Sequence, residues 1–437
     1  VWGMTQAASE LVRSLHHLGV QFNVTDDDEL DLRNFGGQKK KRTAFAQSDT
    51  GKQLMTALID AVRREESAGT VERFPHHKFR TLLLSGNICG GCTVQDTYTG
   101  ELLRFVCDAV LIATGGLHGL FGDTTGSLAN TGEVTAELFR LGVPMANLEM
   151  IQYHPTTVEL GEKRMLLSEA ARGEGGRLFA LRNGKPWYFM EEKYPELGNL
   201  MPRDITAREV WTVSRDYEVF LDMTELPKEV MEHKLAGLVD DCQTYLHKDI
   251  RKEPIPILPG IHYFMGGIQV DERHRTSMRN LYAAGECCAQ YHGANRLGGN
   301  SLLGAIYGGQ IAAETACRET VSSPNMPCAE ESLLPELSPD AQMQMNRILL
   351  NALGVVRDAQ TLEAGIQEIR KLSGTLPLLG CAMLESALAR KESRGAHWRA
   401  DYPQRNDAVY CKTTVAHWNG QHIAISFESI PERRHDL

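Results

Sequence analysis

The turn HGANRLGGNSL, at positions 292–302, constrains the fold of this chain more than any other stretch. A short apolar run that ends in Ala283-Ala284-Gly285-Glu286 precedes it, and an apolar helix is expected from about Asn300 to Ala316. A strand, a small-residue turn and a helix N-terminus together form a site for anions and cofactors, because the first N–H groups of the helix are free and its dipole is positive there. Arg296 in this turn can bind a carboxylate with two hydrogen bonds.

A second apolar run ends in glycines. Residues 103–112 are β-like and lead into Ala113-Thr114-Gly115-Gly116, where missing side chains let a ligand approach the backbone. Hydrophobic spacing predicts helices over 5–19, 50–64 and 133–141, and a further β-like run over 79–85. From about 148 to 260 the composition is more polar and the periodicity irregular, which indicates an inserted domain.

Size and charge narrow the class of protein. The chain has 437 residues, enough for two or three domains, and 42% hydrophobic residues suit a substantial core. A net charge of −10 argues against a general binder of nucleic acid or membranes, so an anionic substrate would need local arginines and histidines. No apolar run reaches about 18 residues, the length that spans a bilayer.

The 10 cysteines are scattered, and no signal peptide indicates export, so a reducing cytoplasm is expected. Cys89-Gly90-Gly91-Cys92 is the one CxxC sequence. It is compatible with a redox pair or half of a metal site. A hairpin turn with two incidental thiols is the favoured interpretation, because no second CxxC and no nearby histidine completes a zinc set.

Four further clusters carry chemically active side chains. They are Gln152-Tyr153-His154-Pro155-Thr156, the stretch 168–176 with Ser168, Glu169 and Arg172, the turn Pro202-Arg203-Asp204, and His262-Tyr263-Phe264-Met265-Gly266-Gly267. On a helix Glu169 and Arg172 share one face and can pair, although such pairs most often lie on solvated surfaces. A lone histidine or an arginine near a helix start is also most often structural. Together, however, two histidines, three arginines and a carboxylate suit a substrate with a carboxylate at each end.

These motifs resemble a known family. ATGG (113–116), HPT (154–156), SEAARGEGG (168–176), PRD (202–204), HYFMGG (262–267), AAGE (283–286), HGANRLGGNSL (292–302) and RKESRGAHWRADYP (390–403) are similar, in order, to the flavoprotein subunit of fumarate reductase and succinate dehydrogenase. L-aspartate oxidase belongs to the same superfamily. The resemblance implies an α/β fold: an FAD-binding Rossmann-like domain (1–147 and 261–325), an inserted α+β capping domain (148–260) and a C-terminal helical domain with a tail (326–437).

The resemblance also implies a role for each matching residue. FAD would exchange a hydride with the central carbons of the substrate. Arg203 would move the proton, and Glu169 and Arg172 would relay it from solvent. An arginine suits this role because it is always protonated and stabilises developing negative charge, although its pKa matches neutrality poorly. Substrate-binding residues would be His154, Ser168, His262, Arg296, Phe35 and Gly299; cofactor-binding residues would be Gly115, Gly116, Glu133, Tyr263, Gly285, Glu286, Ser301 and Leu302.

One position separates the subfamilies. Arg33-Asn34-Phe35-Gly36-Gly37 resembles the FGG of the fumarate and succinate enzymes, whereas aspartate oxidases carry Glu where Phe35 stands. An apolar ring offers a charged amine no partner, and burying that amine unpaired is costly. An unaminated dicarboxylate is therefore favoured. An L-aspartate oxidase-like flavoenzyme and a catalytically silent truncated module stay as alternatives.

The chain departs from the family pattern in two ways. Glu133 stands where the family has Asp in a TGD turn near FAD. About a hundred residues that hold the GxGxxG turn, and in some members a flavin-linking histidine, are expected before Val1. The resemblance further implies an iron–sulfur subunit and, through it, a quinone-reactive membrane subunit as partners. A cytoplasmic location, peripheral on the inner membrane, is expected, with no bound metal and no nucleic acid.

Overall fold

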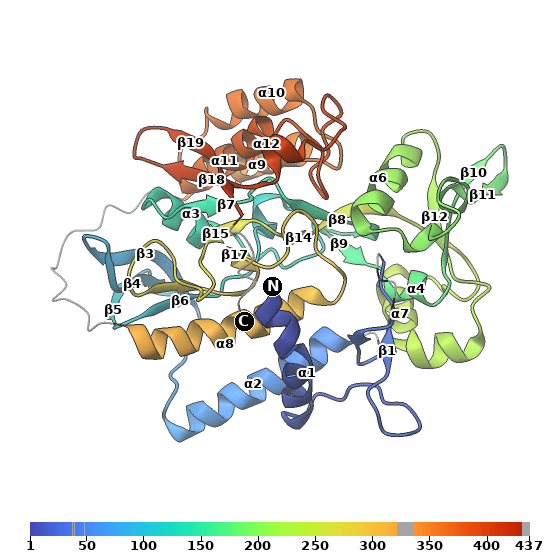
Figure 1. The fold of residues 1–437 in the computed structure, drawn as a ribbon, viewed down its shortest axis with the longest axis horizontal. Coiled ribbons are helices and arrows are strands. Elements are labelled where there is room, and N and C mark those ends of the chain that lie inside the picture. Colours follow the sequence, from blue (N-terminus) through green and yellow to red (C-terminus); the bar gives the residue numbers. More distant parts are fainter. Residues whose placement is uncertain (37, 39, 48, 321–335, 431–437) are drawn as a thin grey trace. The chain divides into compact units, whose positions relative to one another are not determined.

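The computed structural model describes residues 1–36, 38, 40–47, 49–320 and 336–430 (Figure 1). Gly37 of the RNFGG motif, most of the predicted connector 318–340 and the last seven residues lie outside this part of the chain. By contact the chain divides into two compact units. Unit 1 contains residues 1–75, 153–260 and 297–307, and unit 2 contains 76–152, 261–296 and 308–437. The division into three domains at 148, 261 and 326 stays a prediction.

Unit 1 begins with two amphipathic helices, α1 (Trp2–His17) and α2 (Thr50–Ala68). Leu11 and Leu15 of α1 are buried, as their helical spacing predicts. Gly69 ends α2 in the left-handed conformation that glycine adopts without steric cost. Between the helices, the short strands β1 (Leu32–Arg33) and β2 (Thr43–Ala44) pair antiparallel.

The remainder of unit 1 surrounds a four-stranded antiparallel sheet in the order β11-β10-β12-β13. Its core is formed by residues of the sheet and of helix α6, among them Leu178, Leu221 and Val210. The elements in chain order are β8 (Ile151–Leu160), β9 (Lys163–Leu166), α4 (Ala170–Gly173), β10 (Arg177–Arg182), β11 (Lys185–Trp187), α5 (Phe189–Lys193), η2 (Gly198–Leu200), α6 (Arg203–Ser214), β12 (Val219–Asp222), η3 (Val230–Lys234), α7 (Ala236–Asp241), η4 (Cys242–Leu246), β13 (Ile255–Pro256) and β14 (Leu258–Phe264). The first two residues of β8 and the last four of β14 belong to unit 2.

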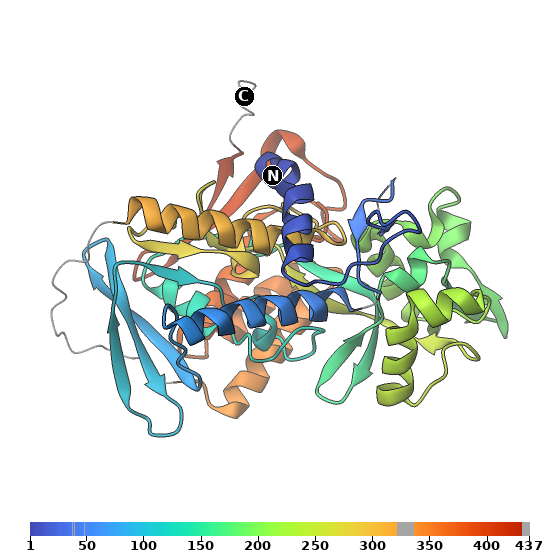
Figure 2. The same cartoon turned by 90° about the horizontal axis from the view of Figure 1, so that it is seen from below.

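The described part of unit 2 contains three sheets. Strands β3 (His77–Ser85), β4 (Ile88–Asp96) and β5 (Leu102–Val106) form an antiparallel sheet, drawn in blue in Figure 2. Strands β6 (Val110–Ile112) and β16 (Leu281–Ala283) form a parallel pair. The third sheet has the order β17-β15-β7-β18-β19, from β7 (Met145–Ala146), β15 (Gly267–Gln269), β17 (Cys288–Ala289), β18 (Lys412–Trp418) and β19 (Ile423–Ser429).

The helices of unit 2 complete its core. α9, α10 and α11 pack on one another, and Figure 1 shows them beside β18 and β19. Leu349, Leu362 and Leu384, one from each helix, are fully buried. The helices are η1 (His118–Leu120), α3 (Glu133–Arg140), η5 (Gly285–Cys287), α9 (Pro339–Ala352), α10 (Ala359–Ile369), α11 (Thr375–Ala389) and α12 (Asp407–Tyr410), and α8 (Asn300–Glu319) runs from unit 1 into unit 2.

Two local predictions were wrong. The β-like run 103–112 is two strands, because Cys107-Asp108-Ala109 forms a turn in which the Cys107 thiol donates to the Ala109 carbonyl at 3.2 Å. The turn between β3 and β4 lies at Gly86-Asn87, so Cys89 and Cys92 sit within β4 rather than in a hairpin turn. Among the described residues, no group of three or more histidine, cysteine, aspartate or glutamate side chains is placed to hold a metal ion.

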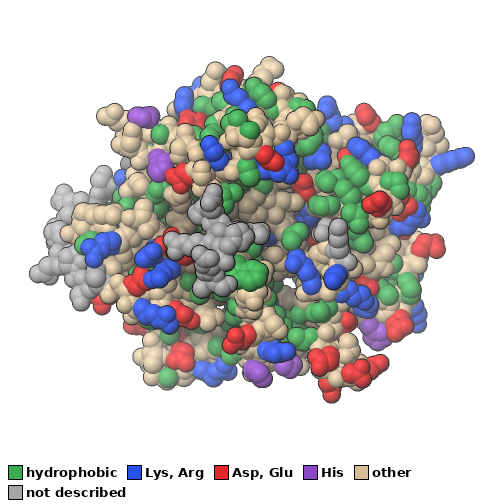
Figure 3. Space-filling view, in the orientation of Figure 1, with side chains coloured by type: hydrophobic (Ala, Val, Ile, Leu, Met, Phe, Trp, Pro, Cys, Tyr) green, Lys and Arg blue, Asp and Glu red, His purple; other side chains and the backbone are tan. Residues whose placement is uncertain are grey.

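The distribution of surface charge and the hydropathy of the helices indicate which classes of partner the protein can bind. On the face shown in Figure 3, basic and acidic side chains are interspersed rather than gathered into a field of one sign. Within the described ranges, no helix is both long enough and apolar enough to cross a bilayer.

Candidate functional site

Glu169 joins two arginines in the interior of unit 1. Its Oε1 accepts a hydrogen bond from Arg172 Nη2 at 3.0 Å, and its Oε2 accepts from Arg203 Nη2 at 2.6 Å and from Arg203 Nε at 3.0 Å. The side chains of Glu169 and Arg172 are 2% and 0% exposed, and that of Arg203 is 8% exposed. The Glu169–Arg172 pair and Arg203 are therefore buried. Their local spacing alone would have favoured positions on the solvated surface.

Short helix starts place these side chains. Glu169 immediately precedes α4, so Arg172 lies one helical turn further along on the same face. Arg203 is the first residue of α6, where Pro202, with φ of −50°, is already compatible with a helix start. Arg172 also donates from Nη1 to the Asn199 carbonyl at 2.8 Å. The three charged groups therefore come from two helix starts, Glu169 and Arg172 from that of α4 and Arg203 from that of α6.

Backbone atoms surround the Glu169 carboxylate closely. Gly36 N–H donates to Glu169 Oε1 at 3.2 Å, and a Cβ on Gly36 would lie 2.6 Å from that same oxygen. A Cβ on Gly298 would lie 2.8 Å from Glu169 Oε2 and 2.8 Å from Phe35 Cβ. Phe35, which the family resemblance assigned to the substrate, and Gly298, which precedes the predicted Gly299, are thus neighbours of the carboxylate. Gly299 itself has φ of +82° and packs against Thr43.

The electrostatics of this cluster favour an added anion. One carboxylate and two guanidinium groups leave one positive charge in excess in a buried place. Burial lowers the pKa of Arg172 below the ordinary arginine value, and the charge of Arg203 lowers it further, although Glu169 opposes both effects. A chain of hydrogen-bonded donors and one acceptor can pass a proton along its length.

His154 lies on β8, and Ser168 lies in the loop that follows β9, the strand paired with β8. Thr156 Oγ1 donates to the Leu167 carbonyl at 3.0 Å, and Leu167 N–H donates to the Thr156 carbonyl at 3.1 Å. Thr156 N–H also donates to His154 Nδ1 at 3.3 Å, which fixes the imidazole of this fully buried histidine. Ser168 Oγ accepts from Ala170 N–H at 3.3 Å and so begins α4.

In unit 2 Arg296 lies against an aromatic ring. Its guanidinium carbon is 4.6 Å from the centroid of Tyr263, within the range of a cation–π contact, and the residue is 3% exposed. Gln152 Nε2 donates to the Arg296 carbonyl at 2.7 Å and to Asn295 Oδ1 at 2.9 Å. Burial, with the charge of Arg296, lowers the pKa of His292 to about 3. His262 is held from Nδ1 by Thr125 Oγ1 at 2.8 Å.

The predicted cofactor turns share one sheet edge. β6 leads into Gly115-Gly116 and β16 into Gly285-Glu286, and because these strands are parallel neighbours both turns follow their carboxyl ends. Ligands of α/β sheets bind outside such ends. Gly115 and Gly285 have φ of +72° and +81°, and Gly116 has no room for a Cβ beside Glu286. Glu286 Oε1 accepts from Phe264 N–H at 2.9 Å, which orients the carboxylate.

The other predicted cofactor residues have different surroundings. Glu133, at the start of α3, forms an ion pair with Lys78 at 2.9 Å. Ser301 and Leu302 lie in the first turn of α8, where the free N–H groups of a helix start are found, and Leu302 is 38% exposed. Each of these features suits a part of FAD. The glycine turns leave room at the edge of the parallel strands, the oriented Glu286 carboxylate can accept from hydroxyl groups, and the start of α8 offers free N–H groups.

Two residues that support the Glu169 cluster were not predicted from the sequence. Gly36 N–H donates to Glu169 Oε1, and the position of Gly36 next to Phe35 was the sole sequence signal for it. Arg33 is 6% exposed, with its guanidinium carbon 4.1 Å from the ring of Phe45 and 5.5 Å from that of Phe35. Burial lowers the pKa of Arg33 to about 10. The sequence around Arg33 is hydrophilic and therefore does not indicate that this side chain is buried.

Comparison with known proteins gives two family matches. Residues 3–302 match the FAD binding domain model, and residues 373–434 match the model of the fumarate reductase flavoprotein C-terminus. The chain is 37% identical to the succinate dehydrogenase flavoprotein subunit of Bacillus subtilis (strain 168), over 98% of this chain and 82% of that protein. It is 29% identical to the L-aspartate oxidase of Streptomyces coelicolor, over 97% and 80% of the two chains.

Among solved structures, the chain resembles E. coli quinol fumarate reductase with a TM-score of 0.86 and 26% identity. The match covers 98% of this chain and 83% of that one.

Proposed function

The chain belongs to the flavoprotein family of succinate dehydrogenase and fumarate reductase and is an FAD-dependent oxidoreductase, and from this premise we propose that it interconverts fumarate and succinate. The observation that carries the proposal is the buried Glu169 carboxylate held between Arg172 and Arg203. A buried ion pair by itself contributes little net stability, so a role in the reaction explains these buried charges better than stabilisation of the fold does.

We assign the two substrate carboxylates to two pairs of residues. His154 and Ser168 would bind one carboxylate, with Phe35 and Gly299 as further substrate-binding residues. His262 and Arg296 would bind the other, and the contact of the Arg296 guanidinium with the Tyr263 ring supports a fixed position for its donors. Phe35 disfavours a charged amine on the substrate, because it offers no hydrogen-bond acceptor.

FAD supplies the two-electron chemistry when bound, and Gly115, Gly116, Tyr263, Gly285, Glu286, Ser301 and Leu302, together with Glu133, would hold it. Arg203 gives a proton to the second carbon during fumarate reduction and takes it back during succinate oxidation. Glu169, which is hydrogen-bonded to two Arg203 nitrogens, restores the proton to Arg203. Arg172, hydrogen-bonded to the other oxygen of Glu169, is the next group in this proton path. Departure of a proton from Arg203 is eased because the other guanidinium keeps a positive charge beside Glu169.

The same assignment extends to partners. We propose that electrons pass to or from a separate iron–sulfur subunit and through it to a quinone-reactive membrane subunit. The similarity to quinol fumarate reductase supports the quinone-reactive partner. We further propose that the chain binds peripherally to the cytoplasmic face of the inner membrane.

Arg203→Lys tests the proton step. In the flavin-loaded enzyme, we expect kcat for fumarate reduction with a reduced dye to fall about 10²- to 10⁴-fold, because an ammonium group cannot keep both contacts to Glu169 and face substrate. The flavin absorbance per protein should be unchanged. Arg215→Lys, at the exposed end of the same helix, is the matched control and should keep the wild-type rate.

Near-normal turnover of Arg203→Lys would remove this residue from the proton step. The same flavin-loaded wild-type preparation is assayed with succinate, fumarate and L-aspartate. Oxidation of L-aspartate without turnover of the two dicarboxylates would favour the aspartate oxidase alternative. Turnover of none of the three would favour a silent module.

A further inference from the structure

The C-terminal segment of unit 2 contains a tight turn at Arg394-Gly395-Ala396-His397. Arg394 N–H donates to the His397 carbonyl at 2.8 Å, and His397 N–H donates to the Arg394 carbonyl at 3.0 Å. Gly395 has φ of +54°, and Ala396 is not among the described residues with positive φ. A positive φ at the first central position alone is the pattern of a type II′ turn, which favours glycine there.

The tip of this turn rests on the loop that carries Arg296. Ala396 N–H donates to the Ala294 carbonyl at 2.9 Å, and a Cβ on Gly395 would overlap that same carbonyl oxygen. Ala294 and Ala396 also pack together against the buried side chains Met150, Tyr263 and Met265. Since Tyr263 is the ring on which the Arg296 guanidinium lies, the turn contacts the backbone two residues before Arg296 and the aromatic ring beneath its guanidinium.

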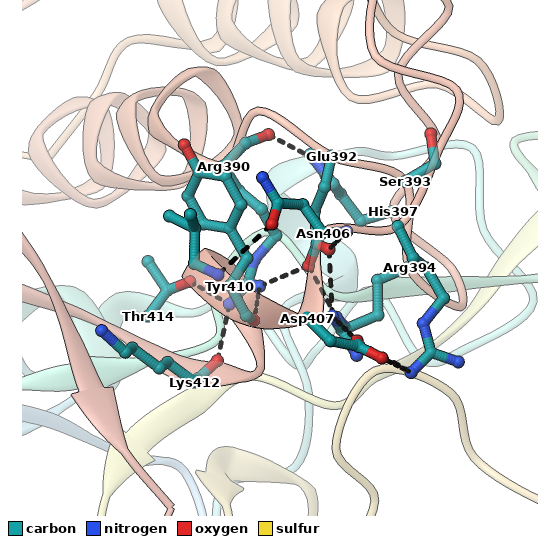
Figure 4. A network of polar contacts seen from close by, with 12 residues as sticks. Arg390, Glu392, Ser393, Arg394, His397, Asn406, Asp407, Tyr410, Lys412 and Thr414 are labelled. Carbon is teal, nitrogen blue, oxygen red and sulfur yellow. Dashed lines mark hydrogen bonds and ion pairs between the residues drawn. The ribbon is translucent and has the colours of Figure 1, made fainter.

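The turn is itself held by an ion network that is buried at Arg390 and Glu392 and exposed at Asp407, drawn in Figure 4. Arg394 binds Glu392 from Nε at 2.6 Å and Asp407 from Nη2 at 2.6 Å. Arg390, whose side chain is 0% exposed, pairs with Glu392 at 2.9 Å and donates from Nε to Glu149 at 2.7 Å. A charge network with its partners in place fixes geometry, because each displaced group would leave another buried charge unpaired.

His397 fixes the other end of the turn. Arg357 Nη1 lies 2.9 Å from His397 Nδ1, and His397 Nε2 lies 3.2 Å from the Arg390 carbonyl. With a guanidinium as donor on one side and a carbonyl as acceptor on the other, the imidazole has the neutral tautomer protonated on Nε2. Both ends of the turn are therefore anchored, and only Gly395 and Ala396 project onto the Ala294 loop.

We propose that the Arg394–His397 turn is a positioning element for Arg296, and that Gly395 is the positioning residue that lets the turn seat on the Ala294 carbonyl. The inference rests on the proposed function, in which Arg296 binds a substrate carboxylate. Gln152 holds the loop at the Arg296 and Asn295 side, and the turn holds it two residues earlier. The direction of the guanidinium then depends on a segment about a hundred residues further along the chain.

Gly395→Ala in the flavin-loaded enzyme tests the proposal. The added Cβ cannot share the space of the Ala294 carbonyl, so the loop must shift and the two-pronged contact to the carboxylate weakens. We expect KM for fumarate and the inhibition constant of malonate to rise about tenfold, equivalent to about 1.4 kcal/mol, with kcat within about threefold of wild type. Malonate has no central carbon pair to oxidise, so it reports binding alone.

Gly86→Ala is the matched control. Gly86 has a similar φ of +59° but no neighbour within 4 Å, in the β3–β4 hairpin of the same unit. Alanine at this position has the energetic cost of a positive φ but does not contact the Ala294 loop. KM for fumarate and the inhibition constant of malonate should therefore stay at wild-type values. Equal effects in the two variants, or unchanged binding constants in Gly395→Ala, would overturn the proposal.

Arg394→Gln covers the case in which Gly395→Ala does not fold. It removes the pairs to Glu392 and Asp407 without a steric clash, and Glu392 keeps its pair with Arg390. We expect the malonate inhibition constant to rise about threefold, with a smaller effect on kcat. An unchanged constant would contradict the proposal. A wild-type enzyme that neither turns over fumarate nor binds malonate would instead contradict the proposed function.

Discussion

Glu169 shows how strongly surroundings change the meaning of a residue. An acid and an arginine three positions apart most often form a solvated pair of little energetic value. Here the pair is buried, and a third charged group, Arg203, reaches the same carboxylate from 34 residues away. The backbone N–H of Gly36 also donates to the carboxylate. The carboxylate is therefore held from several directions, which the proposed proton transfer requires.

Gly36→Ala is expected to displace this carboxylate. Gly36 is not among the residues with positive φ, so alanine costs nothing in the backbone, yet its Cβ would lie 2.6 Å from Glu169 Oε1. We expect kcat to fall about tenfold or more while flavin content is kept, because small misplacements of a proton-transfer group slow the step strongly. Steady-state rates in H₂O and D₂O measure this, and the solvent isotope effect should increase.

Gly51→Ala serves as the comparison for Gly36→Ala. It lies in the first turn of α2 in the same unit, with nothing within 4 Å of the new Cβ. Wild-type kcat is expected for it. A normal kcat in Gly36→Ala would show that the Glu169 geometry tolerates displacement.

Among the secondary-structure elements, strand β4 gives both cysteines of the CxxC sequence a place in a sheet that disfavours a reactive thiol at Cys89. Cys89 is fully buried and Cys92 lies in the ladder with Phe105 of β5. Burial raises the pKa of the Cys89 thiol to about 11, which makes it a poor nucleophile near neutral pH. The glycines between the cysteines are explained by packing, since Gly91 has φ of +142° and its α-carbon closely approaches the Phe105 carbonyl.

Gly91→Ala should therefore destabilise the β3–β4–β5 sheet. The new Cβ would overlap the Phe105 carbonyl oxygen, and the residue would have to hold a left-handed φ. We expect the free energy of unfolding to fall by about 3 kcal/mol, as in other cases of backbone strain with overpacking. Denaturant titration of the purified holoenzyme measures it. Gly86→Ala, in open space, should lose only about 1 kcal/mol, and an equal loss in both variants would contradict the steric argument.

For the molecule as a whole, buried histidines couple stability to pH. Burial lowers the pKa of His274 and His292, and burial with the charges of Arg357, Arg390 and Arg399 lowers that of His397 well below the usual value. Unfolded histidines take up protons near pH 6.5, so below that pH the unfolded chain binds protons that the folded protein does not. The free energy of unfolding must then fall as the pH decreases from about 6.5.

His397→Gln should reduce this pH dependence. The glutamine amide can still donate to the Arg390 carbonyl and accept from Arg357, but it does not titrate. The difference in Tm between about pH 7.5 and about pH 5.5 is expected to be smaller than in wild type, by differential scanning calorimetry. His17→Gln, on the exposed side of α1, should leave the difference unchanged. A wild-type pH dependence in His397→Gln would mean that this imidazole is not kept neutral by folding.

Local patterns in the sequence determined the features whose causes are local. The helix predicted over 50–64 is Thr50–Ala68, and the one over 133–141 is Glu133–Arg140, because 3.6-residue periodicity and terminal glycines act within a few residues. The ordered motifs were also enough to indicate the family and its cofactor, FAD, which the comparisons confirmed. Gly115 and Gly285 were recognisable as turn residues for the same reason.

Contacts between distant segments were decided only by the tertiary structure. Nothing near Arg203 predicts its burial against Glu169, and nothing near Ala294 predicts that Ala396 donates to its carbonyl. The run 103–112 was divided into two strands because its halves pair with different partners, β4 and β16. Side-chain periodicity records which face of an element is apolar, but the partner that covers this face depends on the packing of the folded chain.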